Sequence, residues 1–158
     1  MENYLRDLRS REVETGFPSP GRGPDVQVVE TSGCWLLGGF VRKPHLSPAD
    51  FPDATCLECS ANRLRMETMF PARLVLSCPL LLLTAGLLTA QLLASELARH
   101  EGSFNIILSY DGESCAVRFH KVRAGERWLA EDLEGYVDEG VLVFEAGQNA
   151  PALALLTG

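Results

Sequence analysis

The alternation of hydrophobic and polar positions predicts strands on both sides of a long apolar centre. Two runs of β-branched and apolar residues, at 26–30 and 34–43, are separated by a Thr-Ser-Gly connection and predict a pair of strands. Residues 104–122 predict two further strands around an Asp-Gly dipeptide, which is a strong hairpin signal. An apolar run at 140–147 predicts one more strand. We therefore expect a sheet that is mostly antiparallel.

The apolar centre contains no charge from residue 74 to residue 93. As one helix it would extend about 30 Å, which is enough to cross a bilayer. Pro79 is typical of a first helical turn, so the pattern favours a buried strand at 72–78 followed by a helix at 79–100. The polar residues within that helix and the lack of flanking aromatic anchors argue against a membrane span.

A ridge of small residues runs along the predicted helix. Gly86, Ala90, Ala94 and Ala98 recur at every fourth position, which places them on one side of the helix. Another element can approach the helix backbone closely along such a ridge. We therefore expect either tight packing on the protein's own sheet or a helix-to-helix seam between two copies of the chain.

Together these elements predict a single-domain α+β fold, in which one long apolar helix packs on a mixed, mostly antiparallel sheet. The Pro/Gly-rich segment 16–25 interrupts regular structure before residue 26. We therefore expect residues 1–25 to be a mobile arm and residues 26–147 to be the core domain. Residues 148–158 are expected to be a tail, and residues 128–136 have the pattern of a short helix.

The charge of the chain is acidic and unevenly placed. A formal net charge of −7 and a pI near 4.9 would repel a phosphate backbone, which excludes nucleic acid as the expected partner. Seven acidic residues and one basic residue follow position 125. The acidic residues are Glu126, Glu131, Asp132, Glu134, Asp138, Glu139 and Glu145. This segment suits a steered encounter with a basic partner or, alternatively, a solvated surface that keeps the protein in solution.

The five cysteines are the main candidates for chemistry. Their odd number, and an N-terminus without an apolar signal-peptide core, predict a cytoplasmic location. In a reducing compartment the Cys-x-x-Cys pair of Cys56 and Cys59 is a candidate for half of a tetrahedral zinc site. Cys34, Cys115 or His120 would have to complete that site, and none has the paired spacing of a zinc motif. The alternative is two inert thiols.

Cys78 is the candidate catalytic nucleophile, because it precedes the predicted helix, whose N-terminus would favour a thiolate. The apolar residues around it disfavour a thiolate, so a buried structural cysteine is the alternative. His100, near the end of the helix, has the position of a cap that compensates the helix dipole. His45 and His120 fall in a loop and a strand, and no Ser/His/Asp set can be placed from the pattern.

The order of the motifs suggests a family. Gly38 and Gly39 precede "ATCLEC", and then follow "LSC", "TAGLLTAQLLASELARH" and the hairpin "IILSYDGESCAVRFHKVRAGE". This order resembles the C-terminal half of the ThiF/MoeB superfamily, the bacterial relatives of ubiquitin-activating enzymes, over residues 26–124. The resemblance implies a role in the ATP- and magnesium-dependent activation of a ubiquitin-like sulfur carrier or a peptide. The family's nucleotide-binding half and second Cys-x-x-Cys pair have no counterpart here, so it also implies that the chain does not adenylate alone.

Three functions follow as hypotheses. The first is a split or degenerate ThiF/MoeB-like subunit, non-catalytic or completed by a partner, which would form a homodimer or bind a nucleotide-binding protein. The second is an acidic binding protein, such as an immunity protein that neutralises a toxin. The third is an independent thiol or zinc enzyme built on Cys56, Cys59 and Cys78.

Overall fold

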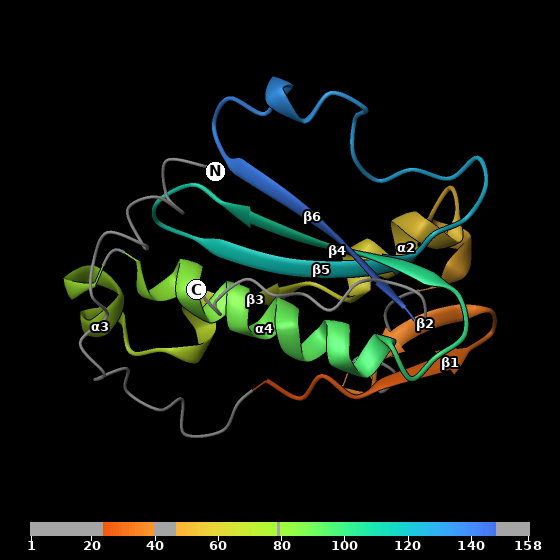
Figure 1. Ribbon diagram of the computed structural model, residues 1–158, viewed down its shortest axis with the longest axis horizontal. Coiled ribbons are helices and arrows are strands. Elements are labelled where there is room, and N and C mark those ends of the chain that lie inside the picture. The colour runs from red at the N-terminus through yellow and green to blue at the C-terminus, as the bar shows by residue number, and fades with distance from the viewer. Residues whose placement is uncertain (1–23, 40–46, 79, 148–158) are drawn as a thin grey trace.

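The chain folds around a four-stranded antiparallel sheet with the strand order β3-β5-β4-β6 (Figure 1). The computed structural model describes residues 24–39, 47–78 and 80–147. The strands are β1 (Val28–Thr31), β2 (Cys34–Leu37), β3 (Leu64–Arg65), β4 (Ser103–Tyr110), β5 (Cys115–Lys121) and β6 (Gly140–Gly147). The helices are α2 (Ala54–Ala61), α3 (Ala72–Ser77) and α4 (Leu81–Leu97), with short 3-10 turns η1 (Pro48–Asp50), η2 (Met66–Met69) and η3 (Leu133–Gly135). The predicted α+β class is therefore confirmed.

Strands β4 and β5 form the hairpin that the Asp-Gly dipeptide predicts. The Asp111 carboxylate accepts hydrogen bonds from the backbone N–H groups of Glu113 at 2.9 Å and Ser114 at 2.6 Å. Gly112 adopts a φ of 100°, in the left-handed region that glycine tolerates. The turn thus has a local cause, and the chain later returns to pair β6 with the other side of β4.

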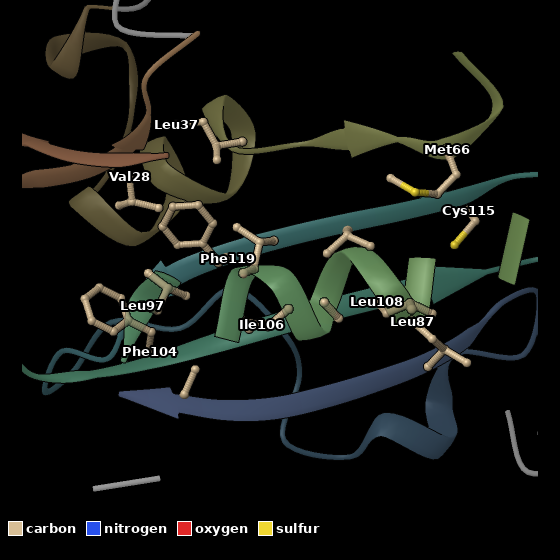
Figure 2. Close-up of a cluster of buried hydrophobic side chains, with 14 of the residues drawn as sticks. Val28, Leu37, Met66, Leu87, Leu97, Phe104, Ile106, Leu108, Cys115 and Phe119 are labelled. Atoms are coloured by element: carbon tan, nitrogen blue, oxygen red, sulfur yellow. The ribbon is translucent and has the colours of Figure 1, made fainter. Parts of the chain in front are cut away.

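Helix α4 covers one face of this sheet and closes the main hydrophobic core (Figures 1 and 2). Fully buried leucines of α4 join side chains that alternate inward along β4 and β5. They are Leu83, Leu87, Leu93 and Leu97 from the helix, Phe104, Ile106 and Leu108 from β4, and Val117 and Phe119 from β5. Burying each such side chain contributes about 1.5–3 kcal/mol, so this layer accounts for much of the stability.

The ridge of small residues on α4 begins against the sheet. A Cβ atom added to Gly86 would lie 2.5 Å from Cys115 Sγ and 3.0 Å from Leu108 Cδ1, and Ala90 is fully buried. Further along, Ala94 is half-buried and Ala98 is exposed. At Gly86 and Ala90 the ridge therefore serves close packing within the molecule.

The β1–β2 hairpin is joined to the large sheet through side chains of α2. Buried Glu58 accepts hydrogen bonds from the backbone N–H groups of Trp35 in β2 and Lys121 in β5, both at 2.7 Å. The same carboxylate is held bidentately by the Arg123 guanidinium at 2.6 and 2.9 Å. Strands β2 and β5, which are not paired by backbone hydrogen bonds, are thereby fixed to one another through a single carboxylate.

Asn62 repeats this connection one helical turn later. Its amide oxygen accepts from the Leu37 N–H at 2.9 Å, and its amide nitrogen donates to the carbonyls of Trp35 at 2.8 Å and Phe119 at 3.2 Å. No strand ladder joins β2 to β5, and buried backbone groups without hydrogen-bond partners are costly. Glu58 and Asn62 supply those partners. We refer to Glu58, Asn62 and Arg123 as the polar clamp.

Two local predictions are wrong. Residues 72–78 were expected to be a buried strand, but Ala72–Ser77 is helix α3, with no buried residue. Alanine, arginine and leucine are good helix formers, and Pro71 lies at the N-cap. The helix expected at 128–136 is only the 3-10 turn η3, because so short a segment, which includes Gly135, cannot offset helix nucleation.

The remaining predictions differ in their boundaries. The long helix runs from Leu81 to Leu97 rather than over 79–100. Among the described residues no helix is long and apolar enough to cross a membrane. The tail at 148–158, His45 and nearly all of the arm expected at 1–25 lie outside the described residues.

Candidate functional site

The face of the sheet opposite α4 is only partly covered. Strand pairing places Asn105 between Glu145 and His120, and Ile107 between Val143 and Arg118, on this outer face. A loop of residues 122–139 rises from β5, passes over this face and returns as β6 (Figure 1). An open hollow of about 290 Å³ remains between the loop and the strands.

The lining of the hollow is mainly apolar, with a few polar groups. The sheet contributes Asn105, Ile107, His120 and Val143. The loop contributes the apolar residues Val122, Trp128, Leu129, Ala130 and Leu133 and the charged residues Glu126, Arg127 and Glu131. Such a mixture is typical of binding sites, in which apolar side chains supply affinity and a few polar groups fix orientation. Among the described residues, no serine, threonine, cysteine, tyrosine or lysine lines the hollow. Its ionisable lining consists of His120, Glu126, Arg127 and Glu131.

The loop is held in place at several points. The Glu126 carboxylate accepts a hydrogen bond of 2.9 Å from the backbone N–H of Thr55, at the N-terminus of α2. The ring of Trp128 lies over the Arg118 guanidinium, with 5.7 Å between the Arg118 Cζ atom and the ring centroid. Within the loop, the Ala130 N–H donates to the Tyr136 hydroxyl at 3.2 Å. The wall of the hollow is therefore anchored to two other elements.

Arg118 is an unusual residue for this face. Burial lowers the pKa of its guanidinium, and the neighbouring Arg63 charge lowers that pKa further, although arginine remains protonated at neutral pH. Its Nε atom is buried and has no hydrogen-bond partner among the described residues. The stacking on Trp128 thus provides an electrostatic contact for a cation that is incompletely hydrogen-bonded.

One ring nitrogen of His120 has a backbone partner. Its Nδ1 atom lies 2.9 Å from the Lys121 carbonyl oxygen, which can only accept, so Nδ1 donates in this contact. The His120 side chain also lines the hollow. Asn105, its cross-strand neighbour, adds an amide that can both donate and accept.

The loop that walls the hollow and the adjacent strand β6 carry exposed acidic residues, of which Glu131 lines the hollow itself. Glu131, Asp132, Glu134 and Asp138 of the loop are exposed, and Glu145 is exposed on the adjacent strand. We refer to these five residues as the acidic rim. The loop has two basic residues, of which Arg123 is paired with Glu58 and Arg127 lies 3.5 Å from Glu131 in an exposed pair that solvent screens strongly. The rim therefore keeps a net negative field next to an apolar hollow.

The proposed metal ligands lie on a helix. Cys56 and Cys59 are on α2, where burial raises the pKa of both thiols and a hydrogen bond to Asp53 adds to the effect at Cys56. Cys59 is fully buried. No group of three or more His, Cys, Asp or Glu side chains that could hold a metal occurs in the described parts of the chain. The structure therefore brings no further ligand to this pair.

The other thiols divide by exposure. Cys78 is exposed after α3, so the alternative of a buried structural cysteine is wrong. Cys34 and Cys115 are buried, and burial is the main cause of the raised pKa of each thiol, to about 12 for Cys115. None of the five cysteines lines the hollow described above.

Motifs and spacing in the sequence do not point to the residues that build the hollow. Trp128 and the acidic residues were visible in the sequence, but their meeting with Arg118, His120 and Asn105 depends on strand register. The alternating pattern of 104–122 contains a usable signal for this face, because Asn105, Arg118 and His120 share it.

The fold and the site together define a single-domain α+β protein whose sheet has one closed face and one partly open, acid-rimmed face. The chain belongs to the Uncharacterized protein PM0498 family, whose model matches residues 24–152. Comparison with curated proteins and comparison with solved structures gave no match.

The family match corrects the resemblance to the ThiF/MoeB superfamily, which is wrong. The motifs that suggested it, a Cys-x-x-Cys pair and an apolar helix, are common in unrelated proteins. Here the pair lies on α2 at helical spacing, with one of its thiols in the core. The expected role in activating a sulfur carrier rested on that resemblance and has no other support.

Proposed function

We propose that this chain is a binding protein whose partner is a basic protein. The observation that supports this proposal is the apolar hollow on the outer sheet face, bordered by the acidic rim. Two of the charged lining residues are already engaged, since Glu126 accepts from the Thr55 N–H and Glu131 pairs with Arg127, which favours binding as the role of the hollow. Neutralisation of a basic toxin, as immunity proteins perform it, is one function of this class.

The two parts of the site have separate roles in this proposal. Apolar lining such as Trp128, Leu129 and Leu133 supplies affinity, because each Å² of apolar surface removed from water contributes about 25 cal/mol. The acidic rim raises the association rate of a basic partner and disfavours acidic ones. The same charges keep the hollow from pairing with a second acidic copy of the chain.

The cytoplasm is the compartment in which we place this binding. All five cysteines are free, including three that are buried and separate from one another in sequence. Free thiols suit a reducing environment.

The experiment is affinity capture from an extract of the native cells at low and at high salt. The bait is the full chain, and the test variant is Glu131→Gln/Asp132→Asn/Glu134→Gln. The matched control is Glu30→Gln/Glu101→Gln/Glu113→Gln, which removes the same charge from exposed positions outside the loop. We expect a basic protein that the wild type and the control capture at low salt, and that high salt or the test variant releases.

Equal capture by the test and control variants would contradict the proposal, because the position of the charge would then be irrelevant. Capture that is independent of salt would contradict the role of the acidic rim.

A further inference from the structure

Strand β6 forms one edge of the sheet along its whole length. Its register with β4 runs without interruption from Gly140, opposite Tyr110, to Gly147, opposite Ser103. Among the described residues no strand pairs with its other side. Alternate residues of this eight-residue strand therefore direct their backbone N–H and C=O groups away from β4, in a row that can accept a further strand.

This edge lacks the features that usually prevent strand addition. Natural edges are shortened, bulged, or interrupted by proline or lysine. β6 has the sequence GVLVFEAG, with no proline, no lysine and no break in register, and Glu145 is its only charged residue. Such an edge is either a liability or a binding surface.

We propose that the outer edge of β6 binds an extended basic segment of the partner by strand addition. This inference rests on the proposed function and specifies how the partner is held. Backbone hydrogen bonds to β6 supply part of the affinity, and side chains at alternate positions supply the specificity.

The two faces of β6 determine which side chains an added strand needs. On the helix side, Leu142 and Phe144 are half-buried against the core, so an added strand extends that layer with apolar side chains. On the outer face Val143, 37% exposed, and Glu145 lie beside the hollow. Lysine or arginine at the alternate positions of the added strand would meet Glu145 and the carboxylates of the loop.

Charge favours a basic segment over a second copy of this chain. Pairing of two β6 edges would bring two copies of Glu145 and of the acidic loop to one border, and like charges across strands are destabilising. A basic segment instead relieves the repulsion within the acidic rim.

The test uses the full chain and a short synthetic peptide of alternating lysine and valine. Two analogues have the same sequence, with N-methyl groups on the valine amides in one and on the inner lysine amides in the other. An antiparallel or parallel added strand directs only alternate N–H groups at β6. We expect one analogue to bind about tenfold or more weakly than the parent, and the other to bind like the parent.

Equal binding of the parent and both analogues would overturn strand addition and leave a purely electrostatic contact. The parent peptide's failure to bind would also overturn it. The affinity-capture experiment tests the proposed function independently of strand addition, because its result depends on the loop charges and not on backbone pairing.

Val143→Lys and Val143→Glu provide a matched pair on the protein side. Both remove the same apolar side chain from an exposed position and put a long polar side chain in its place, so the sign of the charge is the main difference between them. We expect the parent peptide to bind Val143→Lys up to about fivefold more weakly, and Val143→Glu up to about fivefold more tightly, than wild type. No difference between the two variants would place the peptide away from β6.

Amide exchange by NMR identifies any other occupant of the edge. In the free full chain we expect alternate β6 amides to exchange fast, and to become protected when the peptide binds. Uniform protection of β6 in the free chain would overturn the proposal. If that protection increased with protein concentration, a second copy would occupy the edge; if it did not, the chain's own residues would.

Discussion

At the scale of single residues, Glu58 is the side chain with the largest structural role. Its two oxygens hold two backbone N–H groups and one guanidinium in a site closed to water. The contact also raises the pKa of Arg123, mainly through the hydrogen bond to Glu58. A buried ion pair of this kind contributes little relative to apolar packing, but its disruption is costly.

We expect Glu58→Gln to lower the free energy of unfolding by about 3 kcal/mol, because it leaves the Arg123 charge without its counter-ion. Urea denaturation measures the change. Glu113→Gln, which removes an exposed carboxylate, serves as the control and should change stability by less than about 0.5 kcal/mol. An equal effect of the two variants would show that the polar clamp does not hold the hairpin.

The buried thiol of Cys115 makes stability depend on alkaline pH. Burial, followed by the Glu67 and Asp111 charges, raises its pKa from 9.0 to about 12 in the folded protein. The unfolded chain releases this proton at lower pH than the folded chain does. The stabilisation from this group is therefore complete below pH 9.0 and is lost as pH rises toward 12.

Comparison of the wild type with Cys115→Ala tests this dependence. Between neutral pH and about pH 10 the wild type should lose about 1.4 kcal/mol more stability than the variant, because only the wild type carries this thiol. Urea denaturation at both pH values gives the difference. Parallel losses in the two proteins would mean that Cys115 ionises equally in both states.

At the scale of elements, the contact between α4 and the sheet depends on the absence of a side chain at Gly86. Alanine there would gain about 1 kcal/mol in helix propensity, but its Cβ would lie 2.5 Å from Cys115 Sγ. Overpacking a buried site costs about 1–3 kcal/mol. We therefore expect Gly86→Ala to lower stability by about 1 kcal/mol, measured by urea denaturation.

The double variant Gly86→Ala/Cys115→Ala provides the control. Without the sulfur the nearest neighbour of the added methyl group is Leu108 Cδ1 at 3.0 Å, the end of a side chain that can shift by a few tenths of an ångström. Gly86→Ala should therefore become neutral or stabilising in that background. Gly135→Ala, where an added Cβ meets nothing within 4 Å, should change stability little. Additive effects at Gly86 and Cys115 would show that they do not compete for the same space.

The elements that the sequence predicted well have local causes. The hairpin between β4 and β5 follows from an Asp-Gly turn, and the strand at 140–147 follows from a short apolar run. Helix α3 was misread because a short apolar run fits a buried strand and a helix equally. The β4–β5 hairpin already pairs Asn105 with His120, but the position of Trp128 and the rest of the loop over that pair depends on the return of β6 to the far side of β4, so the hollow could not be predicted.

At the scale of the whole molecule, the two faces of the sheet differ: α4 and the main hydrophobic core cover one face, and the other borders the hollow. Trp128 covers Arg118 and lines the hollow, so it is placed to be an anchor for the proposed partner. Its substitution should therefore affect binding more than folding.

We expect Trp128→Ala to weaken partner binding about tenfold to a hundredfold, as aromatic hot-spot residues do. Titration with the captured partner measures this change, and thermal unfolding verifies that the fold persists. Val137→Ala, which truncates an apolar side chain that is 87% exposed in the same loop, is the control and should bind like the wild type. Equal affinity of the two variants would place the partner outside the hollow.

The position of β6 in the chain also has a kinetic consequence. β4 and β5 are joined by a tight turn, whereas β6 reaches β4 only after β5 and a long loop, so closing that pairing costs more chain entropy. We expect β6 to join the sheet last, both in refolding and during synthesis. Its outer edge then exists only in the completed fold, so a partner that binds this edge would distinguish finished molecules from partly folded ones.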